Sequence, residues 1–210
     1  MRVGAGCGRH EVADLGPQRD EQLGDRSYVP GKVLRPAEAT EAPVALLRRV
    51  CRPHLERLVE RTRESANVVV PAGTEVRFIA TVESDHVLRV GDRMGRSVPA
   101  HLASGGKAIL AALPPEEVAE LYSGAEEVDP ARLRTELALV RDRGFAINDQ
   151  RTETGVTAIG AAVTDASGAP MAALSLALPT ARFDREALPA WSGTLIAAAR
   201  RVAEDVAPTR

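Results

Sequence analysis

The sequence contains few aromatic residues, few cysteines and no excess of positive charge. Aromatic side chains make up only 3% of its 210 residues, so we expect a core built from Ala, Val, Leu and Ile. Cys7 and Cys51 form no C-x-x-C motif and have no histidine at metal-ligand spacing, which argues against a zinc site or a disulfide framework. The formal net charge of −2 provides no concentrated positive field, so these residues alone are not expected to form a good nucleic-acid surface.

Long hydrophobic runs are also absent. No segment approaches the roughly 18 apolar residues needed to cross a bilayer, and the N-terminal sequence is too polar for a signal peptide. We therefore expect a cytoplasmic protein without a membrane partner. The hydrophobic share of 44% and the charged share of 27% are typical of a soluble protein with one substantial core.

The sequence pattern divides the chain at about residue 40. Residues 1–40 carry scattered glycines and prolines without a sustained period, which predicts a loop or poor order, separate from a domain over residues 41–210. From Pro43 to Arg63, apolar residues recur at steps of three and four, which predicts an amphipathic helix. Three β-branched runs follow and predict antiparallel strands joined by tight turns: NVVVPAG, TEVRFIATVES and HVLRVGDRMG.

Helices and strands alternate in groups through the second half of the chain. One helix is predicted from the HLASGGKAIL segment through Leu113, and a second, short helix begins at Pro114. A third is predicted from about Pro130 to Arg143 and ends at Gly144. Strands are predicted in FAIND, VTAIGAAVTD and PMAALSLAL, and a final helix from about residue 184 to 206. This order indicates an α+β domain whose antiparallel sheet is covered on one face by helices.

The stretch HLASGGKAIL, residues 101–110, invites comparison with a phosphate-binding loop. Such a loop needs a Ser or Thr after its lysine to hold Mg²⁺, but Ala108 follows Lys107. His101 occupies the position of the first glycine, so the nucleotide-loop interpretation fails and no cofactor is expected. Two other interpretations can hold together. The glycines allow a helix start to approach a strand closely, and the open N–H groups there form a site for a carboxylate.

An enzyme would need a nucleophile, a base and an orienting group. His101 is the only histidine beside a Gly-rich turn with hydroxyl groups nearby, those of Ser97 and Ser104. No G-x-S-x-G elbow occurs, and no carboxylate is placed to orient the imidazole. We therefore predict no catalytic residues, and a small hydrolase working at His101 and Ser104 remains the less favoured alternative.

Four segments in fixed order point to one family. The first is PHLERLVERTRESANVVVPAGTEVRFIATVES, the second GRSVPAHLASGGKAILAALPPEE, the third RDRGFAINDQRTETGVTAIGAAVTDASG and the fourth AALSLALPTARFDREAL. Together they resemble the effector-binding domain of IclR-type bacterial transcription regulators over roughly residues 43–206. The resemblance implies a GAF- or profilin-like α+β fold with a curved antiparallel sheet.

The resemblance also implies a small-molecule effector held between the sheet and the helices. The positions carried over to this chain are Ser104 and Gly105 of the HLASGG turn, Asn148, and the inward strand faces at Val87, Val90, Val156, Ala158, Ser175 and Ala177. In several members of the family a carboxylate, a cysteine and a serine stand at the positions of Asn148, Ala158 and Ala177. Their loss predicts a larger or more apolar ligand than a tiny keto acid, such as an aromatic or aliphatic carboxylate. Ordinary core packing is the alternative role of each strand position.

The resemblance further implies a winged helix-turn-helix ahead of the domain, and self-association as a dimer or tetramer on operator DNA. That module with its connecting helix would need some 70 to 80 residues, and only about 42 precede the domain. DRSYVPGKVL resembles the exit of such a module, which predicts that residues 1–40 are a remnant of it or a linker. DNA is therefore expected as a partner only if a complete helix-turn-helix is present. A stand-alone sensor that acts through protein contacts is the alternative.

Overall fold

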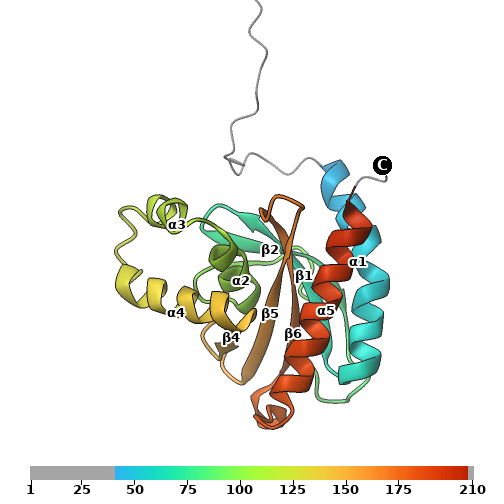
Figure 1. The fold of residues 1–210 in the computed structure, drawn as a ribbon. Coiled ribbons are helices and arrows are strands. Elements are labelled where there is room, and N and C mark those ends of the chain that lie inside the picture. The colour runs from blue at the N-terminus through green and yellow to red at the C-terminus, as the bar shows by residue number, and fades with distance from the viewer. Residues whose placement is uncertain (1–40, 208–210) are drawn as a thin grey trace, which may run out of the picture. The chain divides into compact units, whose positions relative to one another are not determined.

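The structure is a computed structural model that describes residues 41–207 (Figure 1). The elements of that range, in chain order, are α1 (Glu41–Thr62), β1 (Ser65–Ala72), β2 (Glu75–Val82), β3 (Ser97–Pro99), α2 (Ser104–Ala112), α3 (Pro115–Leu121), α4 (Pro130–Arg143), β4 (Ala146–Asp149), β5 (Val156–Thr164), β6 (Pro170–Pro179), the 3-10 helix η1 (Thr180–Arg182) and α5 (Leu188–Val206). No helix in this range combines the length and apolar character that crossing a membrane requires. The predictions for residues 1–40 lie outside the described residues.

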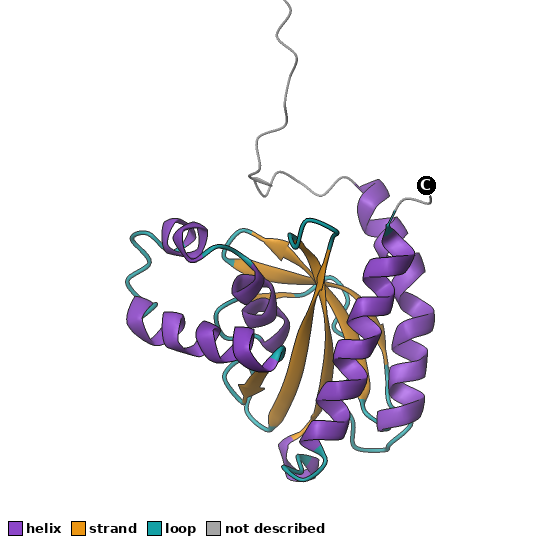
Figure 2. Cartoon of the chain, in the orientation of Figure 1, coloured by secondary structure: helices purple, strands orange, loops and turns teal. Residues whose placement is uncertain are grey.

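The six strands form one antiparallel sheet in the order β3-β2-β1-β6-β5-β4. Two hairpins, β1–β2 and β5–β6, turn at Gly73 and Gly168, whose φ angles are +64° and +87°. Pairing of β1 with β6 joins the two hairpins across the middle of the sheet. The register between β1 and β2 shifts between Val68 and Val69, where Ile79 of β2 is the extra residue of a bulge, and the sheet is strongly twisted (Figure 2). The predicted α+β class with a curved antiparallel sheet is confirmed.

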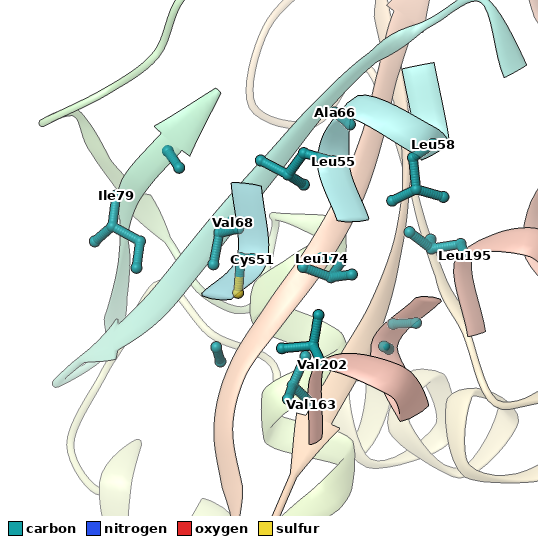
Figure 3. Close-up of a cluster of buried hydrophobic side chains, with 14 of the residues drawn as sticks. Cys51, Leu55, Leu58, Ala66, Val68, Ile79, Val163, Leu174, Leu195 and Val202 are labelled. Carbon is teal, nitrogen blue, oxygen red and sulfur yellow. The ribbon is translucent and has the colours of Figure 1, made fainter. Parts of the chain in front are cut away.

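Helices cover both faces of the sheet, not one face as the sequence pattern predicted. On one face α1 and α5 bury the main core, to which Leu55, Val68, Leu174 and Val202 contribute (Figure 3). On the other face α2 lies against β5 and β6, with α4 packed against α2 (Figure 1). The cause is in β6, where almost every residue is buried because its alternate side chains face opposite helix layers.

The segment 83–96 is a loop, although HVLRV predicted a strand. Side chains from other elements hold its backbone in place of a strand partner. Ser65 Oγ donates a hydrogen bond to the Val90 carbonyl at 2.6 Å, and Arg182 Nη1 donates to the Leu88 carbonyl at 2.7 Å. The same Arg182 donates to both carboxylate oxygens of Glu64, at 2.7 Å each. The prediction of a strand here is therefore wrong, and the loop is anchored to the end of α1 and to η1.

Three glycines let the first turn of α2 lie directly on the sheet. A Cβ atom on Gly105 would come within 2.6 Å of Val69 Cγ2, and one on Gly106 would overlap the backbone of Ala100. A Cβ atom on Gly160 of β5 would lie 2.6 Å from Gly105 N and would overlap the carbonyl of Ser104. The close approach of helix start to strand that the sequence indicated is thus confirmed.

This contact predicts that Gly160→Ala lowers the free energy of unfolding by at least about 2 kcal/mol, because the backbone of α2 must move away from β5. Gly193→Ala is the matched control, since nothing lies within 4 Å of a Cβ atom at that exposed position of α5. The control should stabilise the protein by about 0.5–1 kcal/mol through helix propensity. Urea unfolding followed by circular dichroism measures both, and equal stability of the two variants would contradict the seating of α2.

Candidate functional site

A small cavity lies between the start of α2 and the face of the sheet that α2 covers. Its volume is about 30 Å³, which gives room for about one or two water molecules. It is lined by Asn67, Val69, Phe78, Arg93, Val98, Ala103, Ser104, Gly105, Asn148, Thr152, Val156, Ala158, Ser175 and Ala177. No aspartate or glutamate is among them, so the lining carries one cation and no anion.

Seven of the nine residues predicted to bind a ligand line this cavity: Ser104, Gly105, Asn148, Val156, Ala158, Ser175 and Ala177. Val90 is buried and packs against Ala158 and Ala177 from the loop 83–96, without lining the cavity itself. Val87 is fully exposed at the surface of the same loop. Its placement on an inward strand face was wrong, because the segment that carries it is not a strand.

The start of α2 presents unpaired backbone donors. Its N-cap residue, Ala103, has no side chain that can accept a hydrogen bond, and the first turn contains no acidic residue. Within residues 41–207 no backbone carbonyl or side chain accepts a hydrogen bond from the N–H groups of Ser104, Gly105 and Gly106. These donors coincide with the positive end of the helix dipole, and two of the residues that carry them, Ser104 and Gly105, line the cavity, an arrangement that suits a carboxylate.

Asn148 is held by its own turn. Its Nδ2 donates to Thr152 Oγ1 at 2.7 Å, and its Oδ1 accepts from the N–H of Arg151 at 2.8 Å. The side chain is 2% exposed, so both amide atoms are partnered although the residue is buried. Asn148 therefore shapes the wall of the cavity and fixes the turn after β4.

Sequence reasoning missed Asn67, Arg93 and Thr152. Asn67 is a polar residue in the apolar run SANVVV, a signal that the sequence did contain. Arg93 is one of many arginines, and nothing in its neighbourhood along the chain distinguishes it. Its side chain is only 8% exposed, donates to Glu153 Oε2 at 2.6 Å and lies 6.0 Å from the centre of the Phe78 ring. The cavity is thus more polar than the residues at positions 148, 158 and 177 indicated, where several family members carry a carboxylate, a cysteine and a serine.

Lys107 points away from the cavity. Its Nζ donates to the Ile147 carbonyl at 2.6 Å and contacts Glu136 of α4 at 3.4 Å. Burial lowers the pKa of Lys107, while the charge of Glu136 opposes that shift. Lys107 therefore joins α2 to β4 and α4. This structural role accounts for the lysine that follows the two glycines and that made the segment resemble a phosphate-binding loop.

His101 and Ser104 do not form a catalytic pair in the structure. No hydrogen bond joins His101 to Ser97 or Ser104, and His101 Nδ1 is buried without a partner in the described residues. The ring instead lies edge-on to Tyr122, with 5.7 Å between ring centres. Burial, and after it the charge of Arg151, hold the pKa of His101 below its ordinary value.

A larger cleft of about 540 Å³ lies outside His101, between α4 and the loop before it. Charged residues of both signs line it, among them Glu75, Asp129, Arg132, Glu136 and Arg151. Arg132 and Glu136 form an ion pair with 3.1 Å between Nε and Oε1. Because neighbouring charges already neutralise one another, this cleft offers less to an anionic ligand than the smaller cavity. No cluster of three or more metal-ligating side chains occurs in the part of the chain that the structure describes.

The Lys107–Glu136 contact predicts a defined pH dependence of stability. Burial acts to raise the pKa of Glu136, but Lys107 and Arg132 outweigh it and hold the pKa below its ordinary value of 4.5. A depressed folded-state pKa means that the unfolded chain binds more protons, so the stabilisation is present above pH 4.5 and is lost as the pH falls through the folded-state value.

Glu136→Gln should therefore flatten the decline of the unfolding free energy between about pH 5 and pH 3. Glu120→Gln, at an exposed position of α3, is the control and should leave that slope unchanged. Urea titrations at several pH values measure the slope. A slope that is the same in both variants would contradict the assignment.

Comparison with known proteins gives a consistent result. The family model described as "Bacterial transcriptional regulator IclR C-terminal" matches residues 42–204. The transcriptional repressor IclR of Escherichia coli is 30% identical over 163 residues, which cover 73% of this chain and 60% of that protein. The chain thus spans about 60% of the length of this curated relative. Such relatives are transcriptional regulators and not enzymes, as expected for a chain in which no catalytic site was predicted.

Solved structures agree with this result. The IclR protein of Thermotoga maritima superposes with a TM-score of 0.71 at 25% identity, covering 80% of this chain and 71% of that one. An IclR homologue from Microbacterium hydrocarbonoxydans, complexed with 4-hydroxybenzoate, gives 0.66 at 27% identity, covering 78% and 69%. The chain therefore belongs to the IclR family of bacterial transcriptional regulators, and residues 42–204 form the C-terminal domain of that family.

Proposed function

We propose that the domain senses a small organic acid, and that the acid binds in the cavity between the first turn of α2 and the sheet. The observation that carries the proposal is the set of unpaired N–H groups in the first turn of α2, where Ser104 and Gly105 line the cavity. Arg93 adds a buried cation to the lining, which itself contains no acidic side chain, and its ion-pair partner Glu153 lies outside the lining. An anion is thus the ligand that this set of donors and charges favours.

The cavity must enlarge to admit such an acid, because about 30 Å³ is far less than the few hundred Å³ of ordinary ligand pockets. Arg93 on the loop 83–96 and Glu153 on the turn before β5 form an ion pair beside the cavity. We take these two segments as the parts that move. The acid then shifts the population toward an open arrangement of loop and sheet, which is the event that the rest of the regulator responds to.

The apolar part of the lining supports an aromatic or aliphatic acid. Val69, Phe78, Val156, Ala158 and Ala177 present carbon surface opposite the polar groups. The homologue that was solved with 4-hydroxybenzoate supports an acid of this size. The ligand itself is therefore proposed by class, as a small carboxylic acid with an apolar body.

The regulatory step is proposed by analogy with the relatives, which are transcriptional repressors and regulators. In a cytoplasmic dimer or tetramer, ligand binding would change how the domains associate and so change operator binding by a helix-turn-helix. The described domain has no strongly basic composition, because the whole chain has a formal net charge of −2. A sensor that acts only through protein contacts is the alternative, and a DNA-binding experiment separates the two.

Binding of an acid should raise the melting temperature of the 210-residue chain. At 100 times the dissociation constant, a ligand that binds only the folded state stabilises by about 2.7 kcal/mol, which corresponds to roughly 5–10 °C. Benzoate, 4-hydroxybenzoate, butyrate and pyruvate form a suitable panel. Ser175→Leu fills the cavity and should abolish the shift, whereas Ser97→Leu, at an exposed position of β3, should retain it.

Circular dichroism of Ser175→Leu checks that the variant is folded, and Ser175→Val serves if it is not. A melting temperature that still rises with acid in a folded Ser175 variant would place the ligand elsewhere. A wild-type chain that responds to no acid of the panel would refute the proposed ligand class.

The 210-residue chain is expected to form no specific complex with the DNA upstream of its own gene. The reason is its net charge of −2, which supplies little counterion release on DNA. Electrophoretic mobility shift at low salt tests this, with a random duplex of equal length as the control. A tight, salt-dependent and sequence-specific complex would show instead that residues 1–40 suffice for DNA recognition.

A further inference from the structure

Asn67 carries a buried hydrogen-bond donor that nothing in the fold uses. The residue lies in the middle of β1 and is 1% exposed. Its Oδ1 accepts a hydrogen bond from Thr81 Oγ1 at 2.9 Å, which fixes the plane of the amide. Its Nδ2 has no partner among the described residues. A buried unpaired donor destabilises a fold, so an asparagine at this position needs an explanation other than packing.

The free amide of Asn67 belongs to the same cavity as the start of α2. Asn67 pairs with Ser175 on β6, and Ser175 pairs with Gly160 on β5, so the three residues form one row across the sheet. The first turn of α2 rests on Gly160. Since neighbouring strands are about 4.8 Å apart, Asn67 lies about 10 Å across the sheet from Gly160. The cavity therefore has two separate sets of donors.

Arg93 stands at the Asn67 side of the cavity. Its backbone N–H donates to Thr81 Oγ1 at 3.3 Å, and Thr81 is the residue that holds the amide of Asn67. The guanidinium lines the cavity and donates to Glu153 through Nη2 alone. A guanidinium has five N–H donors, so others remain available for a ligand. The side chains of Asn67 and Arg93 thus both offer hydrogen-bond donors, and a ligand must present an acceptor oxygen to them.

We propose that Asn67 and Arg93 recognise a second oxygen of the effector, which makes the effector a two-ended acid. One end is the carboxylate at the N–H groups of α2. The other is a hydroxyl, keto or carboxylate oxygen that accepts from Asn67 Nδ2 and from the Arg93 guanidinium, across a short apolar spacer. This inference rests on the proposed function and specifies its ligand further.

The energetic consequence is selectivity against one-ended acids. A ligand that lacks the second oxygen leaves Asn67 Nδ2 as unpaired as it is in the unliganded fold, whereas a ligand that has this oxygen gains a hydrogen bond from a donor that is already desolvated. Sites built to hydrogen-bond a ligand group reject analogues without that group more strongly than apolar pockets reject a missing methylene. Asn148, the other asparagine of the lining, is a weaker source of this selectivity because both of its amide atoms already have partners in its own turn.

Isothermal titration calorimetry of the 210-residue chain tests the inference with two matched pairs of acids: benzoate against 4-hydroxybenzoate, and butyrate against succinate. The wild type should bind the two-ended acid of at least one pair about tenfold more tightly. In Asn67→Leu, a near-isosteric change, the ratio should fall to about one, through weaker binding of the two-ended acid. Arg93→Met should lower the ratio as well, whereas Asn148→Leu should retain it even if it changes both affinities.

A purely structural asparagine would behave differently. Removing it would lower the melting temperature and weaken both acids of a pair alike. Here the unliganded Asn67→Leu chain should melt at the same temperature as the wild type or higher, because an unpaired donor has been removed. Asn67→Ala provides the same comparison of ratios if the leucine variant does not fold.

The outcomes separate the two proposals. Equal affinities within both pairs in the wild type, or a ratio that persists in the folded Asn67 variants, would overturn the two-ended ligand and leave acid sensing intact. A wild type that binds neither acid of either pair would refute acid sensing, and the two-ended ligand with it.

Discussion

The seating of α2 on the sheet is the contact on which the rest of the site depends. A Cβ atom on Gly105 would push the helix away from Val69 of β1, and one on Gly160 would push β5 away from the helix backbone. Because the helix begins there, its unpaired N–H groups open into the interior of the domain, where water cannot satisfy them easily. The same seating turns Lys107 outward to Glu136 and Ile147, away from the cavity. One steric constraint therefore sets the position of the donors that are proposed to bind an anion, and it also sets the direction of Lys107.

The two faces of the sheet separate the main core from the proposed ligand site. Against α1 and α5 the strands present large side chains such as Leu174, Leu176 and Ile159, which fill the core completely. Toward α2 the same strands present Ala173, Ser175 and Gly160, which are small and leave space. The alternation of side chains along each strand thus separates the main core from the proposed ligand site. Substitutions on the α2 face can therefore alter that site while the main core stays intact.

The sequence carries enough information to place most of the cavity wall. Ser175, Ala177 and Ala158 follow the two-residue period of their strands, and the family resemblance identified which face was inward. The predicted position of Val87 was wrong because Ser65 and Arg182, which are far from it in the chain, hold the backbone of its loop through hydrogen bonds. Local strand propensity contains no information about such long-range contacts. Asn67 was visible as a polar residue in an apolar run, but its unpaired Nδ2 depends on the register that sets Thr81 opposite it.

Arg182 joins the loop 83–96 to the end of α1. It donates to Glu64, two residues after the last residue of α1, and also to the Leu88 carbonyl on the loop. A helix of 22 residues is about 33 Å long, and α1 packs against α5 and the sheet through Cys51, Leu55 and Leu58. A single arginine thus couples the loop that carries Arg93 to a helix that runs as far as Glu41.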